Sequence, residues 1–106
     1  MPRISVLMPV YNGMPYITEA VESVLAQEEQ NWELVISDNG STDSTRAYLS
    51  TLQDPRIRVH LQQGNLGIFG NMNFLMQQAQ ASIAKILCAD DKLLPGALTK
   101  VAEFME

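Results

Sequence analysis

Three aspartates in the chain could bind a divalent cation together. Asp38 follows a short apolar run, and the adjacent pair Asp90-Asp91 follows another such run. Clustered carboxylate oxygens are the ligands that Mg²⁺ and Mn²⁺ prefer, and these ions are often shared with substrate phosphates. Each segment also has a simpler explanation, because Asp38-Asn39-Gly40 could form a plain turn and Asp90-Asp91 could cap the next helix. The two segments predict a metal and phosphate site only if they lie side by side.

Other common catalytic motifs do not occur in the sequence. No Gly-x-Gly-x-x-Gly follows the first apolar run and no Gly-x-x-x-x-Gly-Lys-Ser/Thr is found, which argues against a dinucleotide fold and a P-loop. The single cysteine, Cys88, excludes an intrachain disulfide and a cysteine-rich metal site. We expect Cys88 to be buried in a strand, His60 to lie on a strand surface and Trp32 to pack rather than bind sugar. The methionine stripe at residues 72–76 is expected to face the core.

Alternating strands and helices would position these side chains. Four short apolar runs favour strands, and three of them are nearly continuous in aliphatic residues, as is typical of parallel strands covered on both faces. Amphipathic repeats predict four helices between and after these runs. The order β-α-β-α-β-α-β-α predicts an α/β fold with a four-stranded, mainly parallel sheet and helices on both faces. The expected strands are residues 4–10, 33–37, 57–61 and 83–89, and the helical repeats lie at 17–25, 48–52, 72–79 and 98–105.

The segments that follow the expected strands differ from those that precede them. Ligands bind to an open parallel sheet beyond the carboxyl ends of its strands. All four segments at that rim are polar and three contain glycine, whereas the opposite rim has the sequence of ordinary surface turns. We therefore expect the site at the carboxyl rim, in residues 11–13, 38–43, 62–67 and 90–92.

The composition is that of a globular protein of at most one domain. The 106 residues are 46% hydrophobic and 18% charged, with a formal net charge of −5. This acidic balance argues against nucleic acid as a partner, but it does not oppose a nucleotide that binds with a divalent cation. No apolar run approaches the ~20 residues that span a bilayer, and the first residues lack a signal-peptide pattern. We expect a cytoplasmic location by default.

Taken in order, the motifs resemble the nucleotide-sugar-binding part of the family 2 glycosyltransferases, which have the GT-A fold. The resemblance covers nearly the whole chain from Ile4 onward. It implies one nucleotide-sugar-binding domain, residues 1–106, that forms the Rossmann-like GT-A donor-binding half of a longer glycosyltransferase. The segments that carry it include Met8-Pro9-Val10-Tyr11-Asn12-Gly13, Asp38-Asn39-Gly40-Ser41, Asn65-Leu66-Gly67 and Ala89-Asp90-Asp91.

The resemblance implies a role for each motif. The end of the first strand would form a floor under the base of a nucleoside-diphosphate sugar, with UDP expected, and Asp38 would accept a hydrogen bond from that base. The last two acids would bind the ribose and a Mg²⁺ or Mn²⁺ ion that bridges the phosphates and stabilises the leaving diphosphate. The nucleotide-binding residues so implied are Pro9, Val10, Tyr11, Asp38, Asn65 and Asp90, and the metal ligands are Asp90 and Asp91.

The resemblance also implies an inverting transfer to a saccharide or lipid-linked acceptor. The general base and the acceptor site are expected beyond Glu106, so we do not expect this chain alone to transfer sugar. An unpaired sheet edge and an apolar helix stripe would invite self-association in such a fragment. Membrane association of the longer protein stays open.

Three positions depart from the family pattern. Cys88 stands where the family often has the first acid of Asp-Ala-Asp-Asp, and Asn39 replaces the second acid of Asp-Asp-Gly-Ser. Met72 stands where an arginine frequently precedes an asparagine, which leaves Lys92 as the nearest basic residue. These departures leave open a non-catalytic nucleotide-binding or scaffolding module. A GT-A nucleotidyltransferase is disfavoured, because residues 11–15 contain no arginine or lysine.

Overall fold

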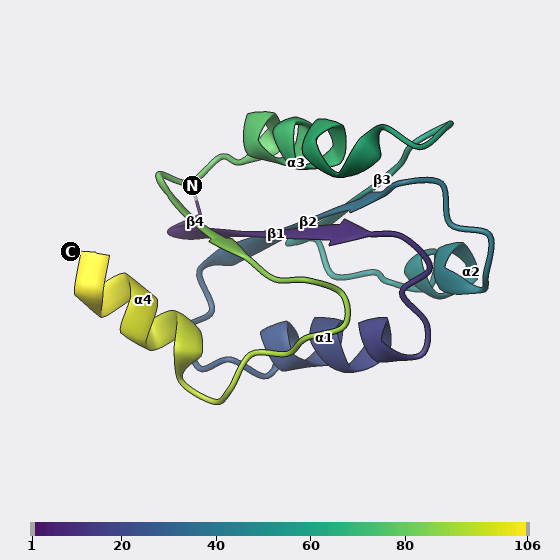
Figure 1. Cartoon of the computed structure of the whole chain (residues 1–106). Coiled ribbons are helices and arrows are strands. Elements are labelled where there is room, and N and C mark those ends of the chain that lie inside the picture. Colours follow the sequence, from purple (N-terminus) through teal and green to yellow (C-terminus); the bar gives the residue numbers. More distant parts are fainter. Residues whose placement is uncertain (1, 106) are drawn as a thin grey trace.

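Strands and helices alternate along the chain in the computed structural model, which describes residues 2–105 (Figure 1). Because each strand is followed by a helix that returns the chain to the start of the sheet, the strands can all run in one direction. The elements are β1 (Ile4–Val10), α1 (Tyr16–Leu25), β2 (Trp32–Asp38), α2 (Thr45–Leu49), β3 (Ile57–Leu61), α3 (Gly67–Gln78), β4 (Ile83–Ile86) and α4 (Ala97–Met105).

The sheet has the order β3-β2-β1-β4, and every neighbouring pair is parallel. The predicted four-stranded parallel sheet is confirmed. The last residues of β1 and β2, Val10 and Asp38, are directly paired, so the two central strands end level with each other. Segments 11–15 and 39–44 therefore leave the sheet side by side.

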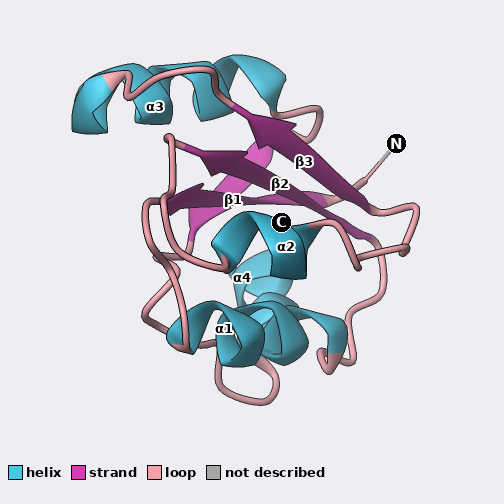
Figure 2. Cartoon of the chain, turned by 90° about the vertical axis from the view of Figure 1, so that its right-hand side faces the viewer, coloured by secondary structure: helices cyan, strands magenta, loops and turns pink. Residues whose placement is uncertain are grey.

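Helices cover both faces of the sheet, as expected. Figures 1 and 2 show α1, α2 and α4 on one face and α3 alone on the other. Successive strand side chains point to opposite faces, so β1 and β2 supply both cores. Met8 and Ile36 pack in the larger core, together with α1, α2 and α4, while Leu7 and Val35 pack against Leu75 of α3.

The expectation that the stripe at residues 72–76 faces the core is wrong. In α3 only Asn71 and Leu75 are buried, and Met76 is 53% exposed. Because no other helix of residues 2–105 lies beside α3 on its face of the sheet, only the row of side chains directly above the strands is covered. Ile68 and Phe69, in the first turn of α3, are also exposed.

One further expectation for a single residue is wrong, and one is confirmed. β4 ends at Ile86, three residues earlier than predicted, and the chain then turns, with the Asp91 N–H donating to the Cys88 carbonyl. Cys88 is therefore exposed rather than buried in a strand. His60 is half-buried against the Phe74 ring, because strand alternation turns it toward α3. Trp32 packs in the core at 1% exposure, as expected.

Within residues 2–105, every helix is too short or too polar to cross a membrane.

Candidate functional site

Two pockets open at the carboxyl rim and share two residues of the β1 end, Pro9 and Tyr11. The first pocket, of about 360 Å³, lies between the β1–α1 segment and the segment after β4. The second, of about 200 Å³, lies on the other side of Tyr11 against α3. The first is lined by Pro9, Tyr11, Asn12, Gly13, Met14, Tyr16, Cys88, Ala89 and Asp90. The second is lined by Pro9, Val10, Tyr11, Asn39, Ile68, Asn71 and Met72.

Tyr11 stands between the two pockets. Its side chain is 54% exposed, although it directly follows Val10, which is 2% exposed. Because β1 ends at Val10, the chain turns out of the sheet there and presents the Tyr11 ring at the rim. The structure thus brings together Pro9, Val10 and Tyr11, which were expected to form the floor of a base site.

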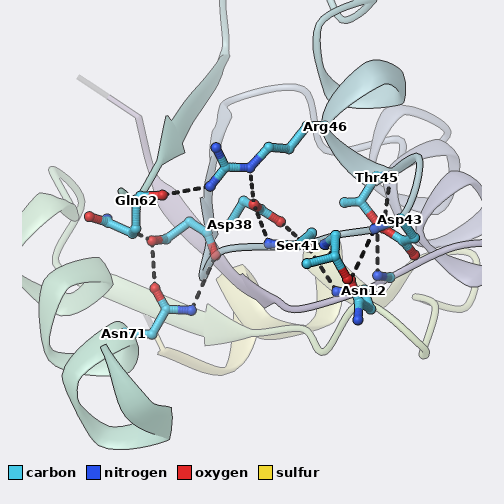
Figure 3. A network of polar contacts seen from close by, with 11 residues as sticks. Asn12, Asp38, Ser41, Asp43, Thr45, Arg46, Gln62 and Asn71 are labelled. Carbon is cyan, nitrogen blue, oxygen red and sulfur yellow. Dashed lines mark hydrogen bonds and ion pairs between the residues drawn. The ribbon is translucent and has the colours of Figure 1, made fainter. Parts of the chain in front are cut away.

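The segment after β1 is fixed by hydrogen bonds from three successive backbone N–H groups. Asn12 donates to the Ser41 hydroxyl at 2.8 Å, Gly13 to the Thr45 hydroxyl at 2.9 Å and Met14 to the Asp43 carboxylate at 3.3 Å. Figure 3 shows Asn12 beside Ser41, Asp43 and Thr45, the first residue of α2. The two segments therefore form one unit beneath the first pocket.

Asn12 adopts a conformation that most residues avoid. Its φ is 51°, in the left-handed region, which asparagine tolerates better than other side chains with a β-carbon. In return, its side-chain oxygen accepts hydrogen bonds from the N–H groups of Thr42 at 2.8 Å and Asp43 at 3.3 Å. The side-chain hydrogen bond from Thr45 and backbone N–H groups lower the pKa of Asp43, so this acceptor stays charged near neutral pH.

Asp38 does not reach either pocket. Its carboxylate is fully buried on the α2 side of the sheet, where it accepts a hydrogen bond from the Arg46 Nε at 2.7 Å. It also accepts hydrogen bonds from the hydroxyl and the N–H of Ser41. Alternation along β2 instead brings the next residue, Asn39, to the pocket beside α3.

The expected convergence of three acids is not seen. Asp90 and Asp91 are both exposed after β4, and Asp90 lines the first pocket, while the Asp91 carboxylate accepts the Lys92 N–H at 2.9 Å. Among residues 2–105, no three acid, histidine or cysteine side chains are grouped closely enough to hold a metal alone. Two adjacent exposed carboxylates nevertheless fit an ion such as Mg²⁺ or Mn²⁺, which takes further oxygen ligands from phosphates and water.

The two amide side chains that line the second pocket, Asn39 and Asn71, are hydrogen-bonded to residues outside it. The Asn39 amide donates to the Asn65 side-chain oxygen at 3.1 Å and accepts the Leu66 N–H at 2.7 Å. Asn65, expected to bind nucleotide, thus supports Asn39 and does not line this pocket. The Asn71 amide pairs with Ser37, through its hydroxyl at 2.5 Å and its carbonyl at 3.1 Å. The free surface of this pocket is therefore mainly apolar.

Sequence reasoning missed several pocket residues and the partner of Asp38. The alternation of β2 could have indicated that Asn39, not Asp38, faces α3. Ile68 was overlooked because the start of α3 has no capping side chain to mark it. No signal pointed to Arg46, a partly exposed arginine in a helix of five residues. Another pocket, of about 270 Å³, lies at the amino rim, where Arg58 is already paired with Glu33.

The chain is similar in sequence to known glycosyltransferases. A glucosyltransferase of Campylobacter jejuni, named GalNAc(5)-diNAcBac-PP-undecaprenol beta-1,3-glucosyltransferase, is 34% identical over 106 residues, covering 97% of this chain and 34% of its own. The putative teichuronic acid biosynthesis glycosyltransferase TuaG of Bacillus subtilis is 39% identical over 106 residues, which are 98% of this chain and 42% of TuaG. The chain thus spans less than half the length of these relatives.

Solved structures show the same fold. TarS of S. aureus, in complex with UDP-GlcNAc, superposes with a TM-score of 0.90 at 27% identity over 97% of this chain and 31% of that chain. The mannosyltransferase PcManGT of Pyrobaculum calidifontis, in complex with GDP-Man and Mn²⁺, gives 0.78 at 27% identity over the same shares. These likenesses confirm the expected Rossmann-like GT-A fold. The family described as Glycosyl transferase family 2 matches residues 5–106, and the chain belongs to that family.

Proposed function

We propose that the chain forms the nucleotide-sugar-binding part of a glycosyltransferase that acts in saccharide or polysaccharide synthesis. The observation that carries this proposal is the pair of pockets that meet at Pro9 and Tyr11, with Asp90 on the far side of the first. A nucleoside diphosphate needs an apolar place for its base and a polar, metal-binding place for its phosphates, and the two pockets supply these in adjacent positions. The UDP-GlcNAc complex of TarS supports a UDP-sugar as the donor.

The base would bind in the pocket beside α3. Tyr11 offers an exposed ring for stacking, and Ile68 and Met72 form an apolar wall opposite it. Since the Asn39 and Asn71 amides are engaged internally, the polar edge of the base would be bound mainly by backbone groups of the rim. Asp38 would then support the pocket floor from beneath instead of bonding the base, as its buried carboxylate requires.

The diphosphate would bind toward Asp90 and Asp91. These carboxylates would hold Mg²⁺ or Mn²⁺, and the Mn²⁺ complex of PcManGT supports such an ion. The ion, when bound, neutralises the negative charge that develops on the leaving diphosphate. With Asp90 lining the first pocket and Asp91 next to it, the two carboxylates would hold the ion beside that pocket, and Lys92 is the adjacent basic residue.

The complete reaction would be an inverting transfer. An acceptor hydroxyl, deprotonated by a general base, would attack the anomeric carbon while the nucleoside diphosphate leaves. We place that base and a saccharide or lipid-linked acceptor outside the described residues, in agreement with the greater length of the relatives. A cytoplasmic location, with membrane association of a longer protein, belongs to the same proposal.

Calorimetric titration of the chain with UDP, with and without Mn²⁺, tests the donor site. We expect binding that requires the metal and is lost in Asp91→Ala. Glu28→Ala is the matched control, because Glu28 is also an exposed acid and lies in the segment between α1 and β2, at the opposite rim. If UDP does not bind under any condition, GDP and dTDP are titrated next. Binding of either would mean that the site prefers another base, and failure of all three nucleotides contradicts a donor site in this chain.

A scaffolding module is the second candidate, favoured by the absence of a third acid beside Asp90 within the described residues. In that case nucleotide affinity would be the same in Asp91→Ala, Glu28→Ala and the unmodified chain.

A further inference from the structure

Arg46 joins three segments at the carboxyl rim. Its Nε donates to the Asp38 carboxylate at 2.7 Å, and its Nη2 donates to the Gln62 carbonyl at 2.5 Å. The Gln62 N–H in turn donates to the Asp38 carbonyl at 2.9 Å. Arg46, in α2, therefore fixes the last residue of β2 and the first residue after β3 in one hydrogen-bonded ring.

The buried carboxylate of Asp38 depends on these donors. Its side chain is fully shielded from solvent, whereas Arg46 is 36% exposed. A buried charge is tolerated only when it is paired and its remaining lone pairs are satisfied. Ser41 supplies the other donors, from its N–H at 3.1 Å and from its hydroxyl. Removing Arg46 would leave the Asp38 charge with a partner set too small to hold it in place.

The Ser41 hydroxyl connects the Asp38 carboxylate to the β1–α1 segment. A hydroxyl carries one proton and two lone pairs, and here the proton is donated to Asp38. A lone pair is thereby directed to the Asn12 N–H, 2.8 Å away. Figure 3 shows Arg46, Asp38, Ser41 and Asn12 as one line of contacts. Asn12 directly follows Tyr11, the residue that both pockets share.

We infer that Arg46 is a positioning residue for the carboxyl-rim site, acting through Asp38 and Ser41 on Asn12 and hence on Tyr11. Arg46 is not among the described residues that line either pocket, so its effect on a ligand is indirect. Its effect on Asn12 is independent of what the site binds. Its effect on nucleotide affinity rests on the proposed function.

The chain contains a matched control at the opposite rim. Arg58 pairs with Glu33 at 2.7 Å, the same N–O distance as in the pair of Arg46 and Asp38. Its side chain is 33% exposed and that of Glu33 is 7% exposed, so the two ion pairs are similarly buried. Arg58→Met and Arg46→Met should therefore lower the free energy of unfolding by similar amounts. A difference between the two variants at the carboxyl rim then cannot come from a general loss of stability.

Amide hydrogen exchange separates the two roles. In Arg46→Met we expect the Asn12 amide to exchange about tenfold faster or more than in Arg58→Met, since its acceptor Ser41 is no longer fixed. Ser41→Ala, which leaves the ion pair in place, should give the same result even if Arg46→Met does not fold. Exchange at Asn12 that is equal in Arg46→Met and Arg58→Met would overturn the inference, as would unaltered exchange in Ser41→Ala.

Calorimetry with UDP and Mn²⁺ extends the test to ligand binding. We expect UDP to bind about tenfold more weakly to Arg46→Met, a change of about 1.4 kcal/mol, and with unchanged affinity to Arg58→Met. Arg46→Lys, which keeps the charge, should recover part of the loss. An equal loss in both methionine variants overturns the positioning role. If UDP does not bind to the unmodified chain, the result contradicts the proposed function and not the positioning role. The positioning role of Arg46 is then tested by amide exchange at Asn12 alone.

Discussion

Gly13 lies where the β1–α1 segment passes between the core and the segment that carries the acids. A β-carbon at this position would lie 3.1 Å from Val10 Cγ1, 3.2 Å from Ile17 Cβ and 3.4 Å from Ala89 Cβ. Two of these atoms are β-carbons, which cannot rotate away, so the backbone itself would have to move. We therefore predict that Gly13→Ala is destabilising, although replacing glycine by alanine usually stabilises a protein because it lowers the conformational entropy of the unfolded chain.

The magnitude follows from two opposing effects. Overpacking a filled core costs about 1–3 kcal/mol, and the smaller entropy of the unfolded chain returns about 0.4–1 kcal/mol. The expected net loss in the free energy of unfolding lies between about 0 and 2.6 kcal/mol and is centred near about 1.3 kcal/mol, which corresponds to about 5–10 °C in Tm for a domain of this size. Because Ala89 precedes Asp90, displacement of Ala89 should also weaken metal-dependent nucleotide binding.

Urea denaturation followed by circular dichroism measures this effect. Gly64→Ala is the matched control, since nothing lies within 4 Å of a β-carbon at Gly64 and its φ is outside the left-handed region. We expect Gly64→Ala to be neutral or stabilising by up to about 1 kcal/mol. If Gly13→Ala unfolds at the same urea concentration as Gly64→Ala, the close packing around Gly13 is refuted.

Two further predictions concern the pocket and the acid stability. Tyr11→Ala should weaken UDP binding by about 1–3 kcal/mol while Tyr11→Phe retains it, because a base stacks on either ring; equal calorimetric affinities for all three proteins would argue against stacking. Burial acts to raise the pKa of Glu33, but hydrogen bonds from Ser5, the Gln80 N–H and Arg58 outweigh it and lower the pKa below its ordinary value of 4.5. Its stabilising contribution is thus present above that value and lost as the pH falls below it. Glu33→Gln should therefore lose less stability than the unmodified chain as the pH falls below 4.5. The free energy of unfolding, measured by urea denaturation at several acidic pH values, tests this. The same dependence on pH in both proteins would contradict this reasoning.

The fold was predictable because its signals are local. The strands β1 and β2 are nearly continuous aliphatic runs, and the buried residues Ile17 and Val24 of α1 follow the helical repeat. The level ends of β1 and β2 then follow from parallel pairing, and Pro9, Val10 and Tyr11 accordingly lie at the carboxyl rim of the sheet. Patterns of this kind depend only on neighbours in the chain.

The errors concern side chains whose surroundings come from distant parts of the chain. Asp38 was expected to face the ligand, but strand alternation turns it toward Arg46, whose position depends on how α2 packs. Cys88 was expected in a strand, but β4 ends at Ile86 and the chain turns outward. The exposure of Met76 depends on whether a second helix lies beside α3, which no periodicity can indicate.

The segment that carries Asp90 and Asp91 is attached differently from the rest of the rim. Its two ends are held by hydrogen bonds, in which the Leu87 N–H donates to the Leu7 carbonyl and the Leu93 N–H donates to the Ser23 hydroxyl, and between them Ala89 packs into the core. Residues 88–92 thus lie between two hydrogen bonds to other elements of the chain. The segment after β1, by contrast, donates hydrogen bonds from three successive residues to the segment after β2 and the start of α2. Because Ala89 is buried while residues 88 and 90–92 are exposed, substitutions at these four exposed positions should change how the acids are presented while Tyr11 and the pocket beside α3 keep their shape.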